Sequence, residues 1–580
     1  DAVPATAANV DGNVTVNIKG GTITNVFAGS NSKGNIGGTV ALTIDKDGDC
    51  PMHITDVYGG GNLAPYYAYG YDVVDGAWTE RTPDPEAPIT YGPIVNLKNG
   101  TVSNNVYGGG LGEAAVVTGN PIVNLIGATV TGDIFGGGDA APVTGNPQVN
   151  ANYGSVKDVF AGGRGETAVV TGNPLAYVNK TDDKELTVQD VYGGGDAANV
   201  AGTGKVQLDK GTVANIYGGG NLACNVAGNT NIEMTKGMIT TYSFTSSPLA
   251  MAAWRYFYDN SMKPNQQKIP ICSVFGAGYG AHTDVAGNTN VNINIPGTAD
   301  IKPADGVDFT HDELEAIDKL ALRLKPDTKL SEQFVPAIHG GGFDGTVGAY
   351  DISTKGINYN KTTYTSQTNI TIQGQPFVFN VFGGGLGSKA GADATGGVSS
   401  YVGAVYGATK VDIQGGLYNG NVFGGGAGIE SEQDVTNPFG GGGTVKLPYT
   451  YAAQVMRETD VTISGNNTII YGNVYGGGDI ANTGWYNENA RPAMTEHVAQ
   501  KNQSLATLDY TTSLKLNGGN ILGSAFGGGN GRTKAQMQMS MFVGTVCGST
   551  NVSLNGTKVW SHVYGGGNMG MVFTCQTIAA

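Results

Sequence analysis

The residues that could carry chemistry in this chain are its carboxylates, histidines and cysteines. Cleavage of a saccharide needs two carboxylates, or a carboxylate with Lys or Arg, on one face. The charged run at 182–185 is typical of a solvated turn, and the six histidines are scattered. No Ser-His-Asp or Cys-His arrangement can be assembled from the spacing. We therefore expect no catalytic residues.

Three aspartates that follow a run of glycines could bind a hard cation: Asp139, Asp196 and Asp479. Gly-Gly-Gly-Asp resembles the calcium-binding nonapeptide repeats, in which a period of nine lets successive turns share each ion. Here the period is 25 residues or more, and Asn often replaces the acid, as at Asn62. We expect no metal and no cofactor. Isolated Ca²⁺ sites at the three aspartates are the alternative.

The five cysteines show neither a CxxC pair nor a zinc-site spacing. Cys547 and Cys575 are 28 residues apart, close to one repeat, so stacking of repeats could bring them together. The odd count leaves at least one thiol unpaired within the chain, and burial in a core is its expected fate. The remaining cysteines are Cys50, Cys224 and Cys272.

The charge and hydropathy of the chain argue against nucleic-acid binding and against a membrane-spanning segment. The net charge is −15, and no basic stripe is present to neutralise phosphates, so nucleic acid is not an expected partner. No run of eighteen apolar residues occurs, so we expect no membrane-spanning segment. The chain starts Asp-Ala-Val-Pro, which fits either a processed mature chain or a fragment.

One motif recurs along the whole chain and organises the other features. It is an aromatic residue followed by three glycines, as in Val57-Tyr58-Gly59-Gly60-Gly61-Asn62. About fourteen copies occur when looser matches are included. Their first positions are Phe27, Tyr58, Tyr107, Phe135, Phe160, Tyr192, Tyr217, Phe275, His339, Phe382, Phe423, Tyr475, Phe526 and Tyr564.

A short alternating strand precedes most copies of the motif at a nearly constant distance. From the first apolar residue of that strand to the aromatic takes 12 residues at Val95/Tyr107 and at Val123/Phe135. Alternation of this kind predicts a half-buried strand with polar side chains facing out. The outward positions are mostly uncharged, and include Asn96, Asn124, Asn150, Asn179, Thr371, Asp412 and Thr462.

This repeated order of strands and glycine motifs predicts an all-β fold, a parallel β-helix (β-solenoid) of about fourteen coils. Each unit has a strand, a Gly-Gly corner, a strand that ends in the aromatic, a Gly-rich corner and a short third strand. Such units cannot bury an apolar face alone, but stacked units share a core. We interpret the glycines as corner residues with positive φ. A phosphate-binding loop would need a helix after the glycines, and no signal for one is present.

Insertions interrupt a single array that we expect to cover residues 1–580, and they are the expected contact surfaces. One short helix is predicted in the third insertion, where Thr310 and Glu313 form a capping box. The insertions lie near 64–93, 240–270, 296–336, 388–404, 427–458, 480–511 and 531–547. The ligand-binding residues we expect are the aromatics Tyr66, Tyr69, Trp78, Trp254, Tyr256, Trp485 and Tyr486.

The Asn-Val-Tyr-Gly-Gly-Gly and Val-x-Gly-Asn-Thr-x-Val patterns resemble the repetitive β-helical surface proteins of anaerobic gut and oral bacteria. The resemblance covers most of the chain outside the insertions. It implies a secreted or cell-surface location and an adhesin or surface-fibre role, by analogy of fold.

From these features we expect a non-enzymatic structural or adhesive solenoid. Its expected partners are host or bacterial surface glycans and proteins, or other copies of the chain in an end-to-end fibre. Two alternatives remain open: a β-helical enzyme that processes polysaccharides, and a glycan-binding adhesin stabilised by Ca²⁺.

Overall fold

The computed structural model divides the chain into two compact units, each built from stacked coils of parallel strands. Unit 1 comprises residues 1–234, 276–290 and 348–358, and unit 2 comprises 235–275, 291–347 and 359–580. The fold is therefore the expected all-β parallel β-helix. The prediction of one array over 1–580 stays a prediction. The described residues are 9–10, 12–68, 71–74, 77–80, 91–240, 272–296, 334–351, 356–357, 365–437, 442–484, 511–534, 536–538 and 543–573.

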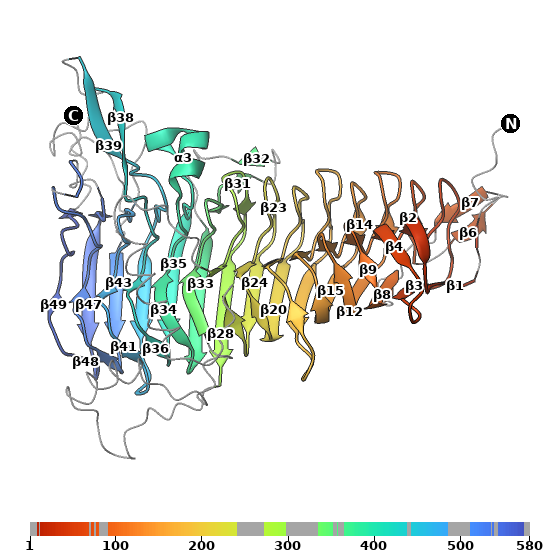
Figure 1. Ribbon diagram of the computed structural model, residues 1–580. Coiled ribbons are helices and arrows are strands. Elements are labelled where there is room, and N and C mark those ends of the chain that lie inside the picture. The colour runs from red at the N-terminus through yellow and green to blue at the C-terminus, as the bar shows by residue number, and fades with distance from the viewer. Residues whose placement is uncertain are drawn as a thin grey trace. The chain divides into compact units, whose positions relative to one another are not determined.

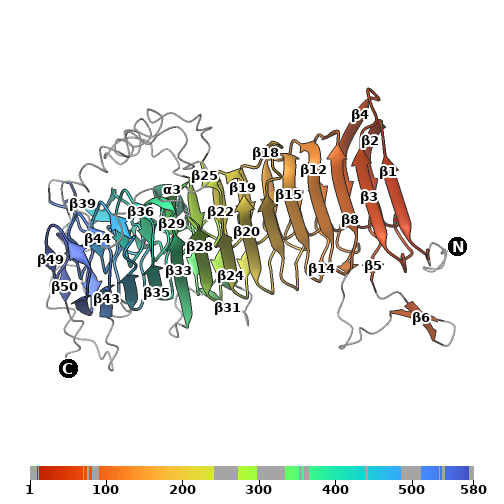
Figure 2. The same ribbon diagram turned by 90° about the horizontal axis from the view of Figure 1, so that it is seen from below.

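One coil of unit 1 shows the predicted order of strands. It consists of β12 (Ile122–Val130), β13 (Ile134–Phe135) and β14 (Val143–Thr144). In β12, Val123 and Leu125 are fully buried while Asn124 between them is only half-buried, which confirms the alternation. The next coil repeats the register, since Val123 pairs with Val149 and Asn124 with Asn150. Figures 1 and 2 both show β12 and β15 (Gln148–Ser155) side by side.

Most other strands of unit 1 fall into the same three rows. The first row contains β1 (Val14–Ile18), β3 (Val40–Asp45), β8 (Ile94–Asn99), β17 (Leu175–Asn179), β20 (Gly204–Lys210) and β24 (Thr230–Met234). The aromatic row contains β2 (Gly21–Phe27), β4 (Met52–Tyr58), β10 (Val106–Tyr107), β16 (Asp158–Phe160), β19 (Asp190–Tyr192) and β22 (Asn215–Tyr217). The third row contains β5 (Tyr66–Tyr67), β11 (Val117–Thr118), β23 (Asn225–Val226) and β27 (Asp284–Val285).

Unit 2 has the same rows. The first row contains β33 (Ser366–Gly374), β35 (Gly407–Ile413), β40 (Thr459–Ile463), β43 (Thr511–Leu516) and β47 (Ser549–Leu554). The aromatic row contains β26 (Ser273–Phe275), β29 (Phe334–His339), β34 (Phe377–Phe382), β37 (Val422–Phe423), β42 (Val474–Tyr475), β45 (Ala525–Phe526) and β49 (Val563–Tyr564). Short strands between these rows are β36 (Leu417–Tyr418), β41 (Ile469–Ile470), β44 (Asn520–Ile521) and β48 (Lys558–Val559). The third row includes β30 (Thr346–Val347), β46 (Val546–Cys547) and β50 (Val572–Phe573).

Two kinds of glycine act differently at the corners. Gly21 and Gly416, at the first corner, have φ of +107° and +101°, as expected for a turn that L-residues rarely adopt. Gly59 and Gly60 of the motif do not have positive φ, so that part of our interpretation was wrong. A Cβ on Gly60 would lie 2.7 Å from the Gly110 nitrogen. The motif requires glycine because the next coil approaches so closely.

Left-handed backbone occurs instead at the fifth residue after the aromatic. Leu63 and Leu222 in unit 1 have φ of 61° and 57°, and Ile480 and Asp344 in unit 2 have φ of 61° and 59°. For L-residues with a Cβ this conformation costs on the order of 1 kcal/mol each. In each of these coils the strained residue lies two positions after the third glycine of the motif.

The described helices are short and lie in an insertion of unit 2. They are α3 (Lys389–Thr395) and the 3₁₀ helix η3 (Gly397–Ser399), within the insertion predicted at 388–404. The helix predicted after Thr310 lies outside the described residues. Among the described residues, no helix has the length and apolar character needed to cross a bilayer.

Candidate functional site

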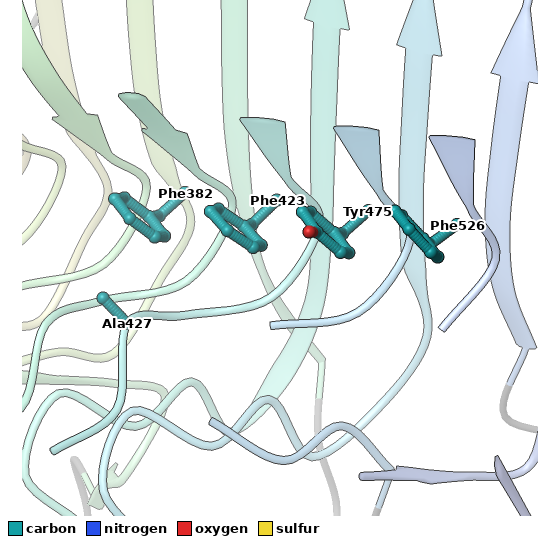
Figure 3. Close-up of a cluster of buried hydrophobic side chains, with 5 residues drawn as sticks. All are labelled: Phe382, Phe423, Ala427, Tyr475 and Phe526. Carbon is teal, nitrogen blue, oxygen red and sulfur yellow. The ribbon is translucent and has the colours of Figure 1, made fainter. Parts of the chain in front are cut away.

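The motif aromatics form a column of stacked rings in each unit. In unit 1 the centroids of Tyr58 and Tyr107 are 4.9 Å apart and their planes differ by 5°. In unit 2, Phe382, Phe423, Tyr475 and Phe526 stack in the same way, as Figure 3 shows. All fourteen motif positions belong to these two columns, which gives fourteen coils within the described residues.

The backbone of the glycines forms a second column beside the rings. The Gly60 N–H donates to the Gly109 carbonyl at 2.9 Å, and the Gly109 N–H donates to the Gly137 carbonyl at 3.0 Å. Unit 2 repeats the pattern from Gly341 to Gly384 and onwards. These corners donate to protein carbonyls in the next coil, so they do not form the anion-binding loop that a phosphate site requires.

Asparagine side chains form a third column. The Asn146 N–H donates to Asn120 Oδ1, and the Asn173 N–H donates to Asn146 Oδ1, both at 2.7 Å. In unit 2 a similar contact lies at another corner, two residues before the aromatic, where the Asn473 N–H donates to Asn421 Oδ1 at 2.7 Å. Each side-chain oxygen thus accepts a backbone N–H of the following coil, at turns that are exposed in unit 1 and partly buried in unit 2.

Arg164 is the centre of a charged group in unit 1. Its backbone lies in register between Asp139 and Asp196 in the adjacent coils, and its Nη1 donates to Tyr107 Oη at 3.0 Å. Burial raises the pKa of both aspartates, and the positive charge of Arg164 partly offsets that rise. Burial likewise raises the pKa of Tyr107 to about 12. The charge of Arg164 thus acts on both aspartates, while its hydrogen bond goes to Tyr107.

A row of three carboxylates lies two residues before the aromatics Phe135, Phe160 and Tyr192, at Asp133, Asp158 and Asp190. Lys157 Nζ lies 2.7 Å from Asp158 Oδ2 and 3.5 Å from Asp133 Oδ1. Asp158 Oδ1 accepts the Asp190 N–H at 3.1 Å. Burial raises the pKa of Asp190 to about 6, although a hydrogen bond from Asn215 opposes that rise.

Arg532 is the centre of a second charged group, in unit 2. Its Nε lies 2.8 Å from Glu430 Oε1, and its Nη1 lies 3.0 Å from Asp479 Oδ1. The three side chains are only 11%, 20% and 13% exposed. Burial alone would lower the pKa of Arg532, but the two carboxylates raise it overall. Glu430 and Arg532 come from different insertions, so this ion pair ties the 427–458 segment to the 531–547 segment.

Aspartates 139, 196 and 479, the three Ca²⁺ candidates, therefore lie beside arginine. Within the described part of the chain, no group of three His, Cys, Asp or Glu side chains is placed to hold a metal ion. Ca²⁺ takes six to eight oxygen ligands, which these pairs do not assemble.

Two further insertions meet on unit 2 and form what we call the insertion pad: α3, η3 and the antiparallel hairpin β38 (Glu432–Thr436) and β39 (Thr444–Pro448). Asp393 on α3 accepts hydrogen bonds from Lys389 Nζ and Tyr449 Oη, both at 2.6 Å, and from Gln433 on β38. Beside the pad, the half-buried rings of Tyr401 and Tyr451 lie 4.8 Å apart. In Figure 1, α3 and the hairpin lie on the outside of the coils.

The structure places few of the aromatics that we predicted as ligand contacts. Tyr66 is 2% exposed and its hydroxyl donates to the Gly38 carbonyl at 3.2 Å, so it is a core residue of β5 and not a surface contact. Trp78 lies in β7 (Ala77–Glu80), which pairs with β6 (Tyr71–Val74) in an antiparallel hairpin. Tyr69, Trp254, Tyr256, Trp485 and Tyr486 lie outside the described residues.

The sequence analysis missed the two arginine-centred groups, the carboxylate row and the insertion pad. For the carboxylate row a signal was available. Aligning the copies of the motif on the aromatic puts Asp133, Asp158 and Asp190 in one column, because the strands repeat in register. No local pattern links Glu430 with Arg532, which are 102 residues apart. Of the cysteines, Cys50 is exposed, Cys224 and Cys272 are buried, Cys547 is disulfide-bonded and Cys575 lies outside the described residues.

The fold and these columns define the chain as a parallel β-helix with coil-to-coil aromatic, glycine and asparagine ladders. No family model, no curated protein and no solved structure matches it.

Proposed function

We propose that the chain is a non-enzymatic structural or adhesive protein, in which the coils form a rigid support and the insertions make the contacts. The observation that carries this proposal is that an arginine lies beside the carboxylates in both charged groups. Arg164 lies between Asp139 and Asp196, and Arg532 binds Glu430 and Asp479. Groups held in this way tie segments together and are not free to exchange protons with a substrate.

The insertion pad supports the adhesive part of the proposal. It presents the charged side chains of Lys389 and Asp393 on the outside of the coils of unit 2, where insertions of a solenoid commonly bind partners. Surface glycans and proteins are the proposed partners, and a further copy of the chain is the proposed partner in a fibre. Nucleic acid is not among them.

A secreted or cell-surface location is part of the proposal. The disulfide at Cys547 supports it, since disulfides persist in oxidising compartments. The resemblance to bacterial surface proteins points the same way.

Electron microscopy and light scattering of the purified chain test the structural role. Filaments or large oligomers are expected, and a uniform monomer would overturn the fibre. A glycan array and a pull-down with surface proteins test the adhesive role, using wild-type protein and the variants Trp78→Ala, Trp254→Ala, Trp485→Ala and Tyr451→Ala. Binding that none of the four variants weakens would remove the insertions as the contact surface.

A polysaccharide-processing enzyme is the second candidate, and the carboxylate row of unit 1 favours it. Asp158 and Asp190 are neighbours, and a carboxyl group with a pKa of about 6 could act as a general acid. Against it, Asp158 already engages Lys157 and the Asp190 N–H. Release of reducing ends from a panel of polysaccharides, abolished by Asp190→Asn, would establish the enzyme in place of the structural role.

A further inference from the structure

Asp344 in unit 2 is a buried carboxylate with an unusual set of contacts. It lies five residues after His339, in the left-handed backbone conformation, and is 5% exposed. Its Oδ1 accepts the Ser388 N–H and its Oδ2 accepts the Ser388 hydroxyl, both at 2.5 Å. Ser388 therefore donates a hydrogen bond to each of the two carboxylate oxygens.

Ser388 is also the residue that starts α3. Its Oγ accepts the Gly391 N–H at 3.0 Å, as an N-cap does. A Cβ on Gly391 would lie 2.4 Å from Asp344 Oδ2, so the first turn of α3 rests directly on the carboxylate. The start of α3 is thus fastened to the coil through Asp344.

Among the described residues, no positive charge pairs with the Asp344 carboxylate. On α3 the titratable residues are Lys389 and Asp393, which pair with each other. On its own segment the nearest titratable residue is His339, whose pKa burial lowers to about 3, so it is neutral. The two other segments that contact it, at Leu386 and Gly403, do so through backbone groups. Burial accordingly raises the pKa of Asp344 to about 6, although the Ser388 hydrogen bonds oppose the rise.

We propose that the docking of α3 on unit 2 is proton-linked, and that a proton taken up by Asp344 tightens the contact. The linkage follows from the buried site: docking removes the carboxylate from water, so the neutral form favours the docked state. α3 also carries Asp393, which accepts hydrogen bonds from Tyr449 and Gln433. Tighter docking of α3 therefore orders the insertion pad. This regulation goes beyond the proposed function and does not depend on the identity of a ligand.

The size of the effect follows from the two protonation states. With a pKa near 6 when docked and an ordinary value near 3.8 when released, lowering the pH from 7.5 to 5 strengthens docking about tenfold. The favourable contribution is complete below the ordinary pKa and is lost as the pH rises through 6.

Hydrogen exchange of the full chain, read by mass spectrometry in peptides covering 386–400, tests the proposal. After correction for intrinsic exchange, protection is expected to be about tenfold higher at pH 5 than at pH 7.5. In Asp344→Asn, whose amide can accept from the Ser388 N–H and donate to its hydroxyl, protection is expected to be high at both pH values.

Asp393→Asn is the matched control, because it weakens the contacts with the hairpin but leaves Asp344 in place. It is expected to lower protection and to retain the pH dependence. Wild-type protection that is equal at both pH values, or higher at pH 7.5, would overturn the proposal without any variant. A pH dependence that persists in Asp344→Asn would assign the linkage to another group.

Discussion

The imidazole of His339 stacks on the ring of Phe382, with centroids 4.7 Å apart and planes 8° from parallel. Phe275 stacks on its other face at 4.8 Å. His339 is 3% exposed, and its Nδ1 has no hydrogen-bond partner among the described residues. A histidine thus occupies a position that its neighbours fill with aromatic rings, and it is neutral because burial lowers its pKa to about 3.

Replacing this histidine with an aromatic hydrocarbon should stabilise unit 2. In the wild type the unfolded chain takes up a proton below pH 6.5 and the folded chain does not, so stability falls as the pH drops from 6.5 towards 3. His339→Phe should gain about 1 kcal/mol at pH 7.5 and about 4 kcal/mol at pH 4.5, measured by urea unfolding. His53→Phe, at an exposed position, is the control. An equal gain at both pH values would contradict the assignment.

The central glycines should tolerate a methyl group only where no coil follows among the described residues. A Cβ on Gly477 would lie 2.7 Å from the Gly529 nitrogen, whereas a Cβ on Gly566, at the same motif position, would meet nothing within 4 Å. Gly477→Ala should destabilise unit 2 by about 3 kcal/mol, since overpacking here displaces backbone. Gly566→Ala should change stability by less than about 1 kcal/mol. Thermal unfolding of both variants tests this prediction. Equal losses of stability would show that the close approach of the next coil is not the reason for glycine at this position.

Two buried threonines should respond to valine in opposite directions. Thr483 replaces a valine in the column Val405, Val455, Thr483, and its hydroxyl has no partner among the described residues. Thr483→Val should therefore stabilise the chain by about 1 kcal/mol. Thr512 Oγ1 donates to the Gly527 carbonyl at 2.7 Å, so Thr512→Val should cost about 1 kcal/mol. If both substitutions change the free energy of unfolding in the same direction, the two hydroxyls are equivalent and the prediction is wrong.

Removal of the Arg532 charge should lower the stability of unit 2, because it leaves the partly buried carboxylates of Glu430 and Asp479 without their cation. Arg532→Met is expected to destabilise unit 2 by about 3–5 kcal/mol at pH 7.5. Lys446→Met, which breaks the exposed pair with Asp434, should cost less than about 1 kcal/mol. If chemical unfolding shows a small loss for both variants, the pairs of Arg532 are not the tie between insertions that the geometry indicates.

The coil was predictable because its signals are local and repeated. The alternation around Val123, the constant distance to Phe135 and the turn glycine at Gly21 each follow from one strand or one corner. The ring columns followed from the repeat itself, since equivalent positions of stacked coils face one another.

The remaining features depend on contacts between distant segments. The sequence does not show that Gly60 is required by the backbone of the next coil and not by its own φ. Tyr66 was misplaced at the surface because its insertion begins with a core strand. The pairing of Glu430 with Arg532 and of Asp344 with Ser388 brings together insertions whose paths leave no periodic signal.

The parallel ring columns also give each unit an optical property. Neighbouring rings such as Phe160 and Tyr192 lie 4.4 Å apart with planes 5° from parallel. At such separations the electronic transition dipoles of adjacent chromophores couple, and a twisted array of coupled dipoles rotates light strongly. Each unit thus contains an intrinsic chromophore whose near-ultraviolet circular dichroism exists only while its coils remain stacked.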